Sequence, residues 1–285
     1  MSNERRKRYP SDLTDQQWEI IEFLVPRQHK SRKGGRPRSV DMLEVLNTIF
    51  YQCRSGCQWD MLPHDLLPKS TVYDYFARWR DDGTLRRIND RLVSAIRMLE
   101  APSEEMKPSA ASIDSQSVKT SERSSSRGYD GGKKITGRKR NIAVDTLGLL
   151  LAVTVTIASV DDAYAARPVM KQLSQVRQPR LQVVWADSKY HNHALREWIG
   201  RQKNLSWELE VVRRPKGAKG FVLLPKRWVV ERTFSWLGRW RRLSRDYEHR
   251  TESSEAMIHV ASIGRMLRRL APANNQPPFK YRLTA

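Results

Sequence analysis

The sequence contains few cysteines, no long apolar run and a clear deficit of acidic residues. Cys53 and Cys57 are its only cysteines, and no second Cys or His pair follows at zinc-finger spacing. We therefore expect buried structural thiols rather than a zinc site, in a reducing compartment such as the cytoplasm. The longest apolar run, 149–153, is far shorter than the roughly 20 residues that span a bilayer, and the polar, basic N-terminus is unlike a signal peptide. No membrane partner is expected.

Positive charge is what the sequence has in excess. Its 52 Lys and Arg residues outnumber its 31 Asp and Glu residues, for a formal net charge of +21. Solubility requires much less, so the favoured partner is a polyanion, and nucleic acid in particular. Hydrophobic residues make up 39% of the 285 positions. That proportion allows a sizeable core in one or two domains.

The first third of the chain has the pattern of an all-helical region. Apolar spacing predicts helices over 14–25, over 43–53, after Pro68 with Ser70 as N-cap, and over 85–99. A short turn at 58–63 followed by a helix with a polar outer face is typical of a helix-turn-helix unit, although other small helical bundles share the pattern. In that unit Tyr73, Arg78 and Arg80 would face DNA.

Several segments have the composition of arms, linkers and tails. We expect a basic arm at 5–8 that is disordered unless it lies on phosphates, a mobile linker at 27–38, an interdomain linker at 100–109 and a loosely ordered tail at 272–285. The predicted organisation is a helical DNA-binding region (1–105), a second domain (106–270) and a tail (271–285).

The second domain has an α/β pattern. Strands are predicted over 112–118, 138–144, 149–157, 181–186 and 207–212, helices over 168–176 and 192–200, a hairpin turn at 145–148, and basic loops at 121–137 and 213–219. In such a sheet, residues toward the carboxyl ends of neighbouring strands converge on one edge, where ligands bind. Asp114 and Asp187 are therefore expected to meet there.

The stretch 227–242 predicts an amphipathic helix. Its apolar stripe contains Val230, Phe234 and Leu237, and its polar, basic stripe contains Arg232, Ser235, Arg239 and Arg242. Glu231 lies beside the apolar stripe and should point toward the protein body. Its partner is either Arg227, in an ordinary ion pair, or a functional site. If Glu231 joins Asp114 and Asp187, the three carboxylates require a multivalent cation, and oxygen-only ligands favour magnesium or manganese.

Five segments carry a more specific signal: Ile113–Lys119, Gly128–Lys134, Ala143–Gly148, Ala186–Tyr190 and Val230–Tyr247. Together they resemble the bacterial DDE transposases of the insertion-sequence-five family, over nearly the whole chain. The resemblance implies a ribonuclease-H-like domain in which Asp114, Asp187 and Glu231 are both catalytic residues and metal ligands, with two Mg²⁺ or Mn²⁺ ions. It implies cleavage of double-stranded DNA at the terminal inverted repeats of an element and strand transfer into target DNA. A homodimer on DNA in the bacterial cytoplasm, associated with the nucleoid, would carry out both steps.

The match around Glu231 is incomplete. The family has an Arg four positions before the Glu, and Arg227 fits, but Leu224 stands where the family has Tyr and Gly238 where it has a basic residue. We expect Arg227, Arg232, Arg239 and Arg242 to contact DNA, although a charged stripe can also be a solvated helix face. Two rival functions are a catalytically silent DNA-binding descendant of a transposase and a different ribonuclease-H-like nuclease.

Overall fold

The computed structural model describes residues 6–26, 40–100, 107–175, 180–203, 205, 207–213, 215, 217 and 224–272. Its N-terminal third is helical: α1 (Asp15–Ile21), η1 (Glu22–Leu24), α2 (Met42–Ser55), η2 (Trp59–Met61), α3 (Lys69–Asp81) and α4 (Thr84–Glu100). The strands are β1 (Ala110–Lys119), β2 (Gly128–Asp130), β3 (Ile135–Asp145), β4 (Leu150–Ile157), β5 (Val183–Ala186) and β6 (Glu208–Val211). The helices of the second half are α5 (Asp162–Gln175), η4 (Ser188–Tyr190), α6 (His193–Gly200), α7 (Pro225–Gly238), η5 (Arg241–Leu243) and α8 (Thr251–Leu270).

The described strands form one mixed sheet. β1 pairs antiparallel with β3, β3 pairs antiparallel with β4, and β5 and β6 add in parallel on the other side of β1. β2 pairs with the first residues of β3 on the edge that β4 also occupies. Three antiparallel strands followed by two parallel ones give the predicted ribonuclease-H-like arrangement, which is confirmed.

Two glycines permit close approaches in this sheet. A Cβ on Gly137 would lie 1.9 Å from the Val118 carbonyl oxygen, so only glycine fits between β3 and β1 there. Gly148 has φ of 77° in the hairpin turn between β3 and β4. Asp145 accepts hydrogen bonds from the backbone N–H groups of Leu147 and Leu149 and is ion-paired with Arg97 at 2.7 Å. The prediction that Asp145 is a turn residue is confirmed.

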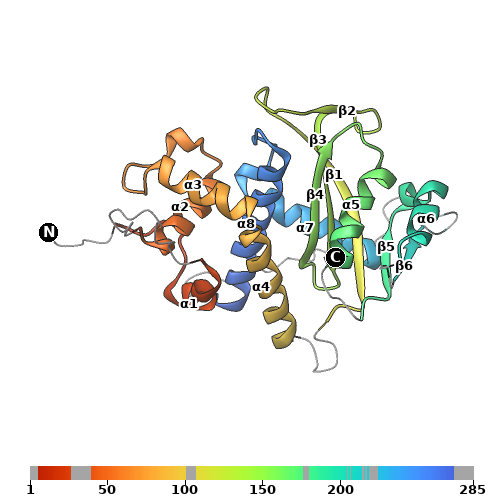
Figure 1. The fold of residues 1–285 in the computed structure, drawn as a ribbon, viewed down its shortest axis with the longest axis horizontal. Coiled ribbons are helices and arrows are strands. Elements are labelled where there is room, and N and C mark those ends of the chain that lie inside the picture. Colours follow the sequence, from red (N-terminus) through yellow and green to blue (C-terminus); the bar gives the residue numbers. More distant parts are fainter. Residues whose placement is uncertain are drawn as a thin grey trace.

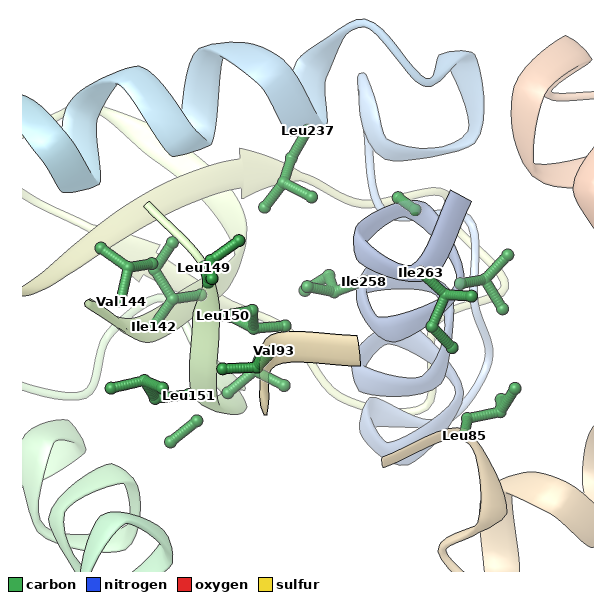
Figure 2. Close-up of a cluster of buried hydrophobic side chains, with 14 of the residues drawn as sticks. Leu85, Val93, Ile142, Val144, Leu149, Leu150, Leu151, Leu237, Ile258 and Ile263 are labelled. Carbon is green, nitrogen blue, oxygen red and sulfur yellow. The ribbon is translucent and has the colours of Figure 1, made fainter. Parts of the chain in front are cut away.

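Helix α8 lies between the helical region and the sheet (Figure 1). On one side it packs against α4, α2 and α3, and on the other against β4. The close-up in Figure 2 shows side chains of α4, α8, the β3–β4 hairpin and α7 gathered around this junction. One hydrophobic cluster therefore runs from the N-terminal helices into the sheet.

Several helices and strands begin or end at residues other than the predicted ones. The helix predicted at 168–176 begins at Asp162, because the Asp161 carboxylate caps the Ala163 N–H at 2.9 Å, and Pro168 lies inside it. Ser70 is not an N-cap, since α3 begins at Lys69 after Pro68. The predicted loop at 121–137 contains β2 and the start of β3. The helix predicted to reach residue 242 ends at Gly238.

The described part of the basic arm is not disordered. Arg6 is ion-paired with Asp12 and Glu44, each at 2.8 Å, and Arg8 is ion-paired with Asp15 at 2.6 Å. Arg5, the linker at 27–38, most of the linker at 100–109 and most of the tail at 272–285 lie outside the described residues.

Cysteine burial agrees with prediction at one of two positions. Cys53 is fully buried, burial raises the pKa of its thiol, and its Sγ lies 3.8 Å from the Met257 carbonyl oxygen. Cys57 is only half-buried. Within the described segments, no helix has the length and apolar character needed to cross a bilayer.

Glu255 on α8 supplies a pH-dependent test of this junction. Its carboxylate accepts the Val155 N–H of β4 at 2.8 Å, and burial raises its pKa to about 7, with Glu252 adding to the rise and Arg86 opposing it. The stability contributed by protonated Glu255 is present below the unfolded-state pKa and is lost as pH rises through about 7. Glu255→Gln keeps the acceptor but cannot ionise. The free energy of unfolding of Glu255→Gln, relative to that of the wild type, should therefore rise by up to about 3 kcal/mol between pH 4 and pH 8. Urea titrations at the two pH values measure this difference.

Glu22→Gln, at an exposed position on η1, is the control and should change stability little at either pH. An equal difference between Glu255→Gln and the wild type at both pH values would contradict a buried, protonated Glu255.

Candidate active site

Asp114 lies in the middle of β1, the central strand. Because side chains alternate along a strand, Asp114 is on the face that α7 covers, and its neighbour Ser115 is on the face that α5 covers. Burial raises the pKa of Asp114 to about 6, and the charge of Asp187 adds to the rise. The Ser115 N–H at 2.7 Å and the charges of Arg227 and Lys133 act in the opposite direction.

Asp187 directly follows β5 and is level with Asp114. Ser112 pairs with Trp185 in the parallel ladder, and two residues further along each strand are Asp114 and Asp187. Adjacent strands lie about 4.8 Å apart, so the two aspartates are neighbours. Asp187 is also the N-cap of η4, where its Oδ1 accepts the Lys189 N–H at 2.9 Å. The prediction that these aspartates meet in space agrees with this geometry, although Asp114 lies mid-strand rather than at a carboxyl end.

Glu231 lies on α7 but does not point into the protein as predicted. Its side chain is 41% exposed, because Val230 and Phe234 occupy the side of α7 that packs on the sheet. Arg227 Nη2 lies 3.1 Å from Glu231 Oε1 and 4.0 Å from Asp187 Oδ2. The ordinary ion pair considered from the sequence is therefore present, and the same guanidinium group links Glu231 to Asp187.

The donor set has the chemistry that a divalent cation requires. All three side chains are carboxylates, which suit magnesium and manganese. Among the described residues, however, no three acidic, His or Cys side chains are close enough together to hold a metal ion. Arg227 supplies the positive charge between Asp187 and Glu231.

Comparison with known proteins assigns the chain to a family. Residues 105–263, more than half of the chain, match the family model described as "Transposase DDE domain". The chain belongs to the family of DDE transposases. Residues 13–89 match a second model, described as "Putative transposase of IS4/5 family". The recognition made from the sequence is confirmed, and DDE domains generally use divalent metal ions.

Two relatives of this DDE-family chain match part of it. A "Putative transposase for insertion sequence element IS402" from Burkholderia cepacia is 30% identical over 130 residues, which cover 44% of this chain and 60% of the relative. An "Uncharacterized protein y4sN" from Sinorhizobium fredii is 36% identical over 73 residues, or 26% of this chain and 56% of that protein. The chain thus spans less than two thirds of the length of either relative.

Three residues that the sequence reasoning did not select surround the acids of this DDE-family chain. Tyr190 is fully buried, and burial together with the charges of Asp114, Asp162 and Asp187 raises the pKa of its phenol. Asp162 accepts from Ser115 Oγ at 2.6 Å and is ion-paired with Lys139 at 3.0 Å, so its charge is already balanced.

Lys133 is the third of these residues. The Asp130 carboxylate accepts the N–H groups of Gly132 and Lys133, each at 3.0 Å, and this turn brings Lys133 Nζ to 3.1 Å from the Ser115 carbonyl oxygen. The motif Gly128–Lys134 contained the signal, since an Asp followed by two glycines and two lysines is a turn that presents a cation.

The predicted recognition helix has two of its three selected side chains on the surface. Tyr73 is exposed and contacts Trp59 edge-on, with ring centroids 5.6 Å apart, and Arg78 is exposed beside Tyr75. The prediction that Arg80 faces outward is wrong. Its side chain is only 6% exposed, because it is ion-paired with Asp81 at 2.7 Å and donates to Ser253 Oγ of α8 at 2.9 Å. Arg80 therefore joins α3 to α8 instead of facing outward.

The basic stripe predicted after Glu231 is also only partly present. Arg232 lies over the Trp236 ring, 4.5 Å from its centroid, and Arg239 is exposed at the C-terminus of α7. Arg242 does not share their face, because α7 ends at Gly238 and Arg242 lies on η5. It is buried, ion-paired with Glu248 at 2.7 Å, and donates to the Cys57 carbonyl oxygen.

Arg242→Ala should therefore destabilise the fold. The substitution leaves the Glu248 carboxyl group buried without its ion-pair partner. Burial already raises the pKa of this group, which shows that its charged form is disfavoured there. We expect a loss of about 3–5 kcal/mol in the free energy of unfolding, measured by urea titration. Arg245→Ala, three positions on and exposed, should cost less than about 0.5 kcal/mol. Equal, small losses in both variants would show that Arg242 is an ordinary surface residue.

Proposed function

We propose that this chain is an insertion-sequence transposase that cleaves double-stranded DNA at the terminal inverted repeats of its element and transfers the freed ends into target DNA. The observation that carries the proposal is the placement of the acids within a DDE domain. Asp114 on β1 is level with Asp187, which directly follows the adjacent parallel strand β5, and α7, which carries Glu231, packs against both strands. We further propose that it acts as a homodimer on DNA, in the bacterial cytoplasm at the nucleoid.

In this proposal Asp114, Asp187 and Glu231 are the catalytic residues and hold magnesium or manganese, with two ions bound. The bound ions would activate the attacking oxygen and stabilise the leaving oxygen in an in-line displacement at phosphorus. Asp114 is a suited ligand because its burial disfavours an uncompensated negative charge, which a cation would relieve. Glu231 can turn toward the aspartates once Arg227 releases it.

The remaining tasks fall to the cationic side chains of the site. Arg227, half-buried between two acids, is placed to exchange its carboxylate partners for a DNA phosphate. Lys133 approaches the same edge from the turn after β2 and can neutralise a second phosphate. Water first attacks the phosphorus at the element end and displaces the 3′-oxygen, which leaves as a 3′-hydroxyl. That hydroxyl then attacks a phosphorus of the target strand and displaces the target's own 3′-oxygen.

One observation favours the alternative of a catalytically silent, DNA-binding descendant. The Arg227–Glu231 pair satisfies the carboxylate that cleavage would need. Such a pair at i and i+4 contributes only about 0.2–0.5 kcal/mol, however, which a multivalent cation and a phosphate can readily exceed. The ion pair therefore does not prevent catalysis.

Substitution of the three acids separates the two functions. Asp114→Asn, Asp187→Asn and Glu231→Gln keep side-chain shape but remove the charge that holds a cation. Each should reduce magnesium-dependent cleavage of DNA carrying the element ends to background on denaturing gels, while gel-shift affinity in EDTA stays within about threefold. Glu197→Gln, at an exposed position on α6, is the matched control and should cleave normally.

Wild-type cleavage by any of the three variants would remove that residue from the site. A wild-type protein that binds its element ends and never cuts them would support the silent descendant.

We also propose that residues 1–105 recognise the element ends through α3, with residues 106–270 as the catalytic domain and 271–285 as a tail. Tyr73→Ala and Arg78→Ala should each weaken binding to end DNA by about 1–3 kcal/mol relative to random DNA, in competition assays with the full chain. Arg91→Ala, at an exposed position on α4, should leave this preference unchanged. Equal losses on both DNAs would place sequence recognition elsewhere.

A further inference from the structure

A cavity rich in arginine lies beside α7, away from the three acids. It encloses about 550 Å³ among the described residues. Its walls come from α2, α7, α8, the segment after α7, the β3–β4 turn and the chain before α1. The lining residues are Pro10, Arg54, Leu147, Arg232, Trp236, Arg239, Trp240, Arg265, Arg268 and Arg269.

Two tryptophans hold four of these arginines in place. The guanidinium carbons of Arg54 and Arg268 each lie 5.4 Å from the Trp240 ring centroid. Those of Arg232 and Arg265 lie 4.5 and 4.1 Å from the Trp236 ring centroid. Guanidinium groups packed on indole rings keep their N–H edges available, so the cavity presents a set of positioned donors.

The described lining of this cavity contains six arginines and no carboxylate. Arg269 is ion-paired with Glu100 of α4, which lies outside the lining. Arg54 and Arg265 donate to the Arg239 and Gly148 carbonyl oxygens, which satisfy N–H groups but do not neutralise charge. Burial, together with the charges of neighbouring Arg269 and Arg232, lowers the pKa of Arg265 to about 10. An anion in the cavity would relieve this repulsion.

We propose that this cavity binds backbone phosphates of the DNA that the active site processes. The inference rests on the proposed function and adds a second, non-catalytic site to it. The cavity is much larger than one phosphate, and guanidinium groups match phosphate oxygens in bidentate pairs. A continuous strand of phosphates suits it better than an isolated anion does.

Helix α7 carries both Glu231 of the candidate active site and Trp236 of the cavity. Glu231 and Trp236 are five residues apart, so they are separated by about 7.5 Å along the helix axis and by about 140° around it. Phosphates on one strand repeat every 3.4 Å along B-DNA, so a strand at Glu231 reaches the cavity within a few nucleotides. Because α2 and α8 supply the other arginines, the cavity forms only where the helical region packs on the catalytic sheet.

The test measures how affinity for DNA depends on salt. The full chain is titrated in EDTA onto a labelled duplex of arbitrary sequence, over a range of KCl concentrations, by fluorescence anisotropy. Arg54→Gln/Arg268→Gln should flatten the slope of log affinity against log salt by about 1.8, or 0.9 for each lost phosphate contact. Arg54→Lys/Arg268→Lys keeps both charges and should keep the slope.

The matched control is Arg91→Gln/Arg201→Gln, which loses the same net charge at two exposed positions outside the cavity lining and should leave the slope unchanged. A wild-type slope in the cavity double variant, or an equal loss in the control, would overturn the proposal. If the double variant melts well below the wild type, Arg54→Gln alone decides, since Arg54 is exposed: a loss of about 0.9 supports the site and no loss overturns it. Binding in EDTA requires no cleavage, so a wild-type protein that never cuts its element ends would overturn the proposed function without changing this result.

Discussion

Two arginines buried in the sheet hold the segment that connects α7 to α8. Arg138 pairs with Asp246 at 3.4 Å and donates to the carbonyl oxygens of Glu248 and His249, while Arg140 donates to those of Leu243 and Arg245. A buried guanidinium group without these partners would destabilise the fold, so detaching the segment from the sheet would require a large free energy. Glu231 on one side of the segment and α8 on the other are positioned by the same contacts.

This anchoring directs α8 into the space between the helical region and the sheet (Figure 1). The two halves of the chain consequently share a hydrophobic core, with Leu85 of α4 and Leu150 of β4 in the same cluster as Ile258 of α8 (Figure 2). Separating the helical region from the sheet at residue 105 would expose the apolar side chains of this shared core to water. Under the proposed function, DNA held by the helices would therefore be tied mechanically to the edge of the sheet that carries Asp114 and Asp187, as cleavage next to a recognised sequence requires.

At the candidate active site, three carboxylates lie near one arginine. Asp114 is buried near Asp187, and Arg227 occupies the space between Asp187 and Glu231. The same chain gathers arginines around Trp236 and Trp240 on another side of α7. Helix α7 thus lies between the proposed cation site and the proposed phosphate site, and DNA with bound divalent ions would supply both kinds of charge.

Much of the fold followed from the sequence by itself, because hydrophobic periodicity and turn residues are local signals. The four N-terminal helices and the β3–β4 hairpin at Asp145 are of this kind. The expected meeting of Asp114 and Asp187 came instead from the rule for parallel sheets, and their level register was decided by the pairing of β1 with β5. The side-chain partners of arginine were decided only by tertiary structure. Arg78 and Arg80 share a helix, as do Arg232 and Arg227, yet Arg80 is buried against Ser253 and Arg227 links two acids. Arg242 pairs with Glu248 because α7 ends at Gly238. A long, flexible cation can reach several partners, and its choice depends on which distant segments packing brings near. The sequence therefore pointed to Arg232 and Arg239 of the arginine cavity but not to Arg54, Arg265 and Arg268, which α2 and α8 contribute.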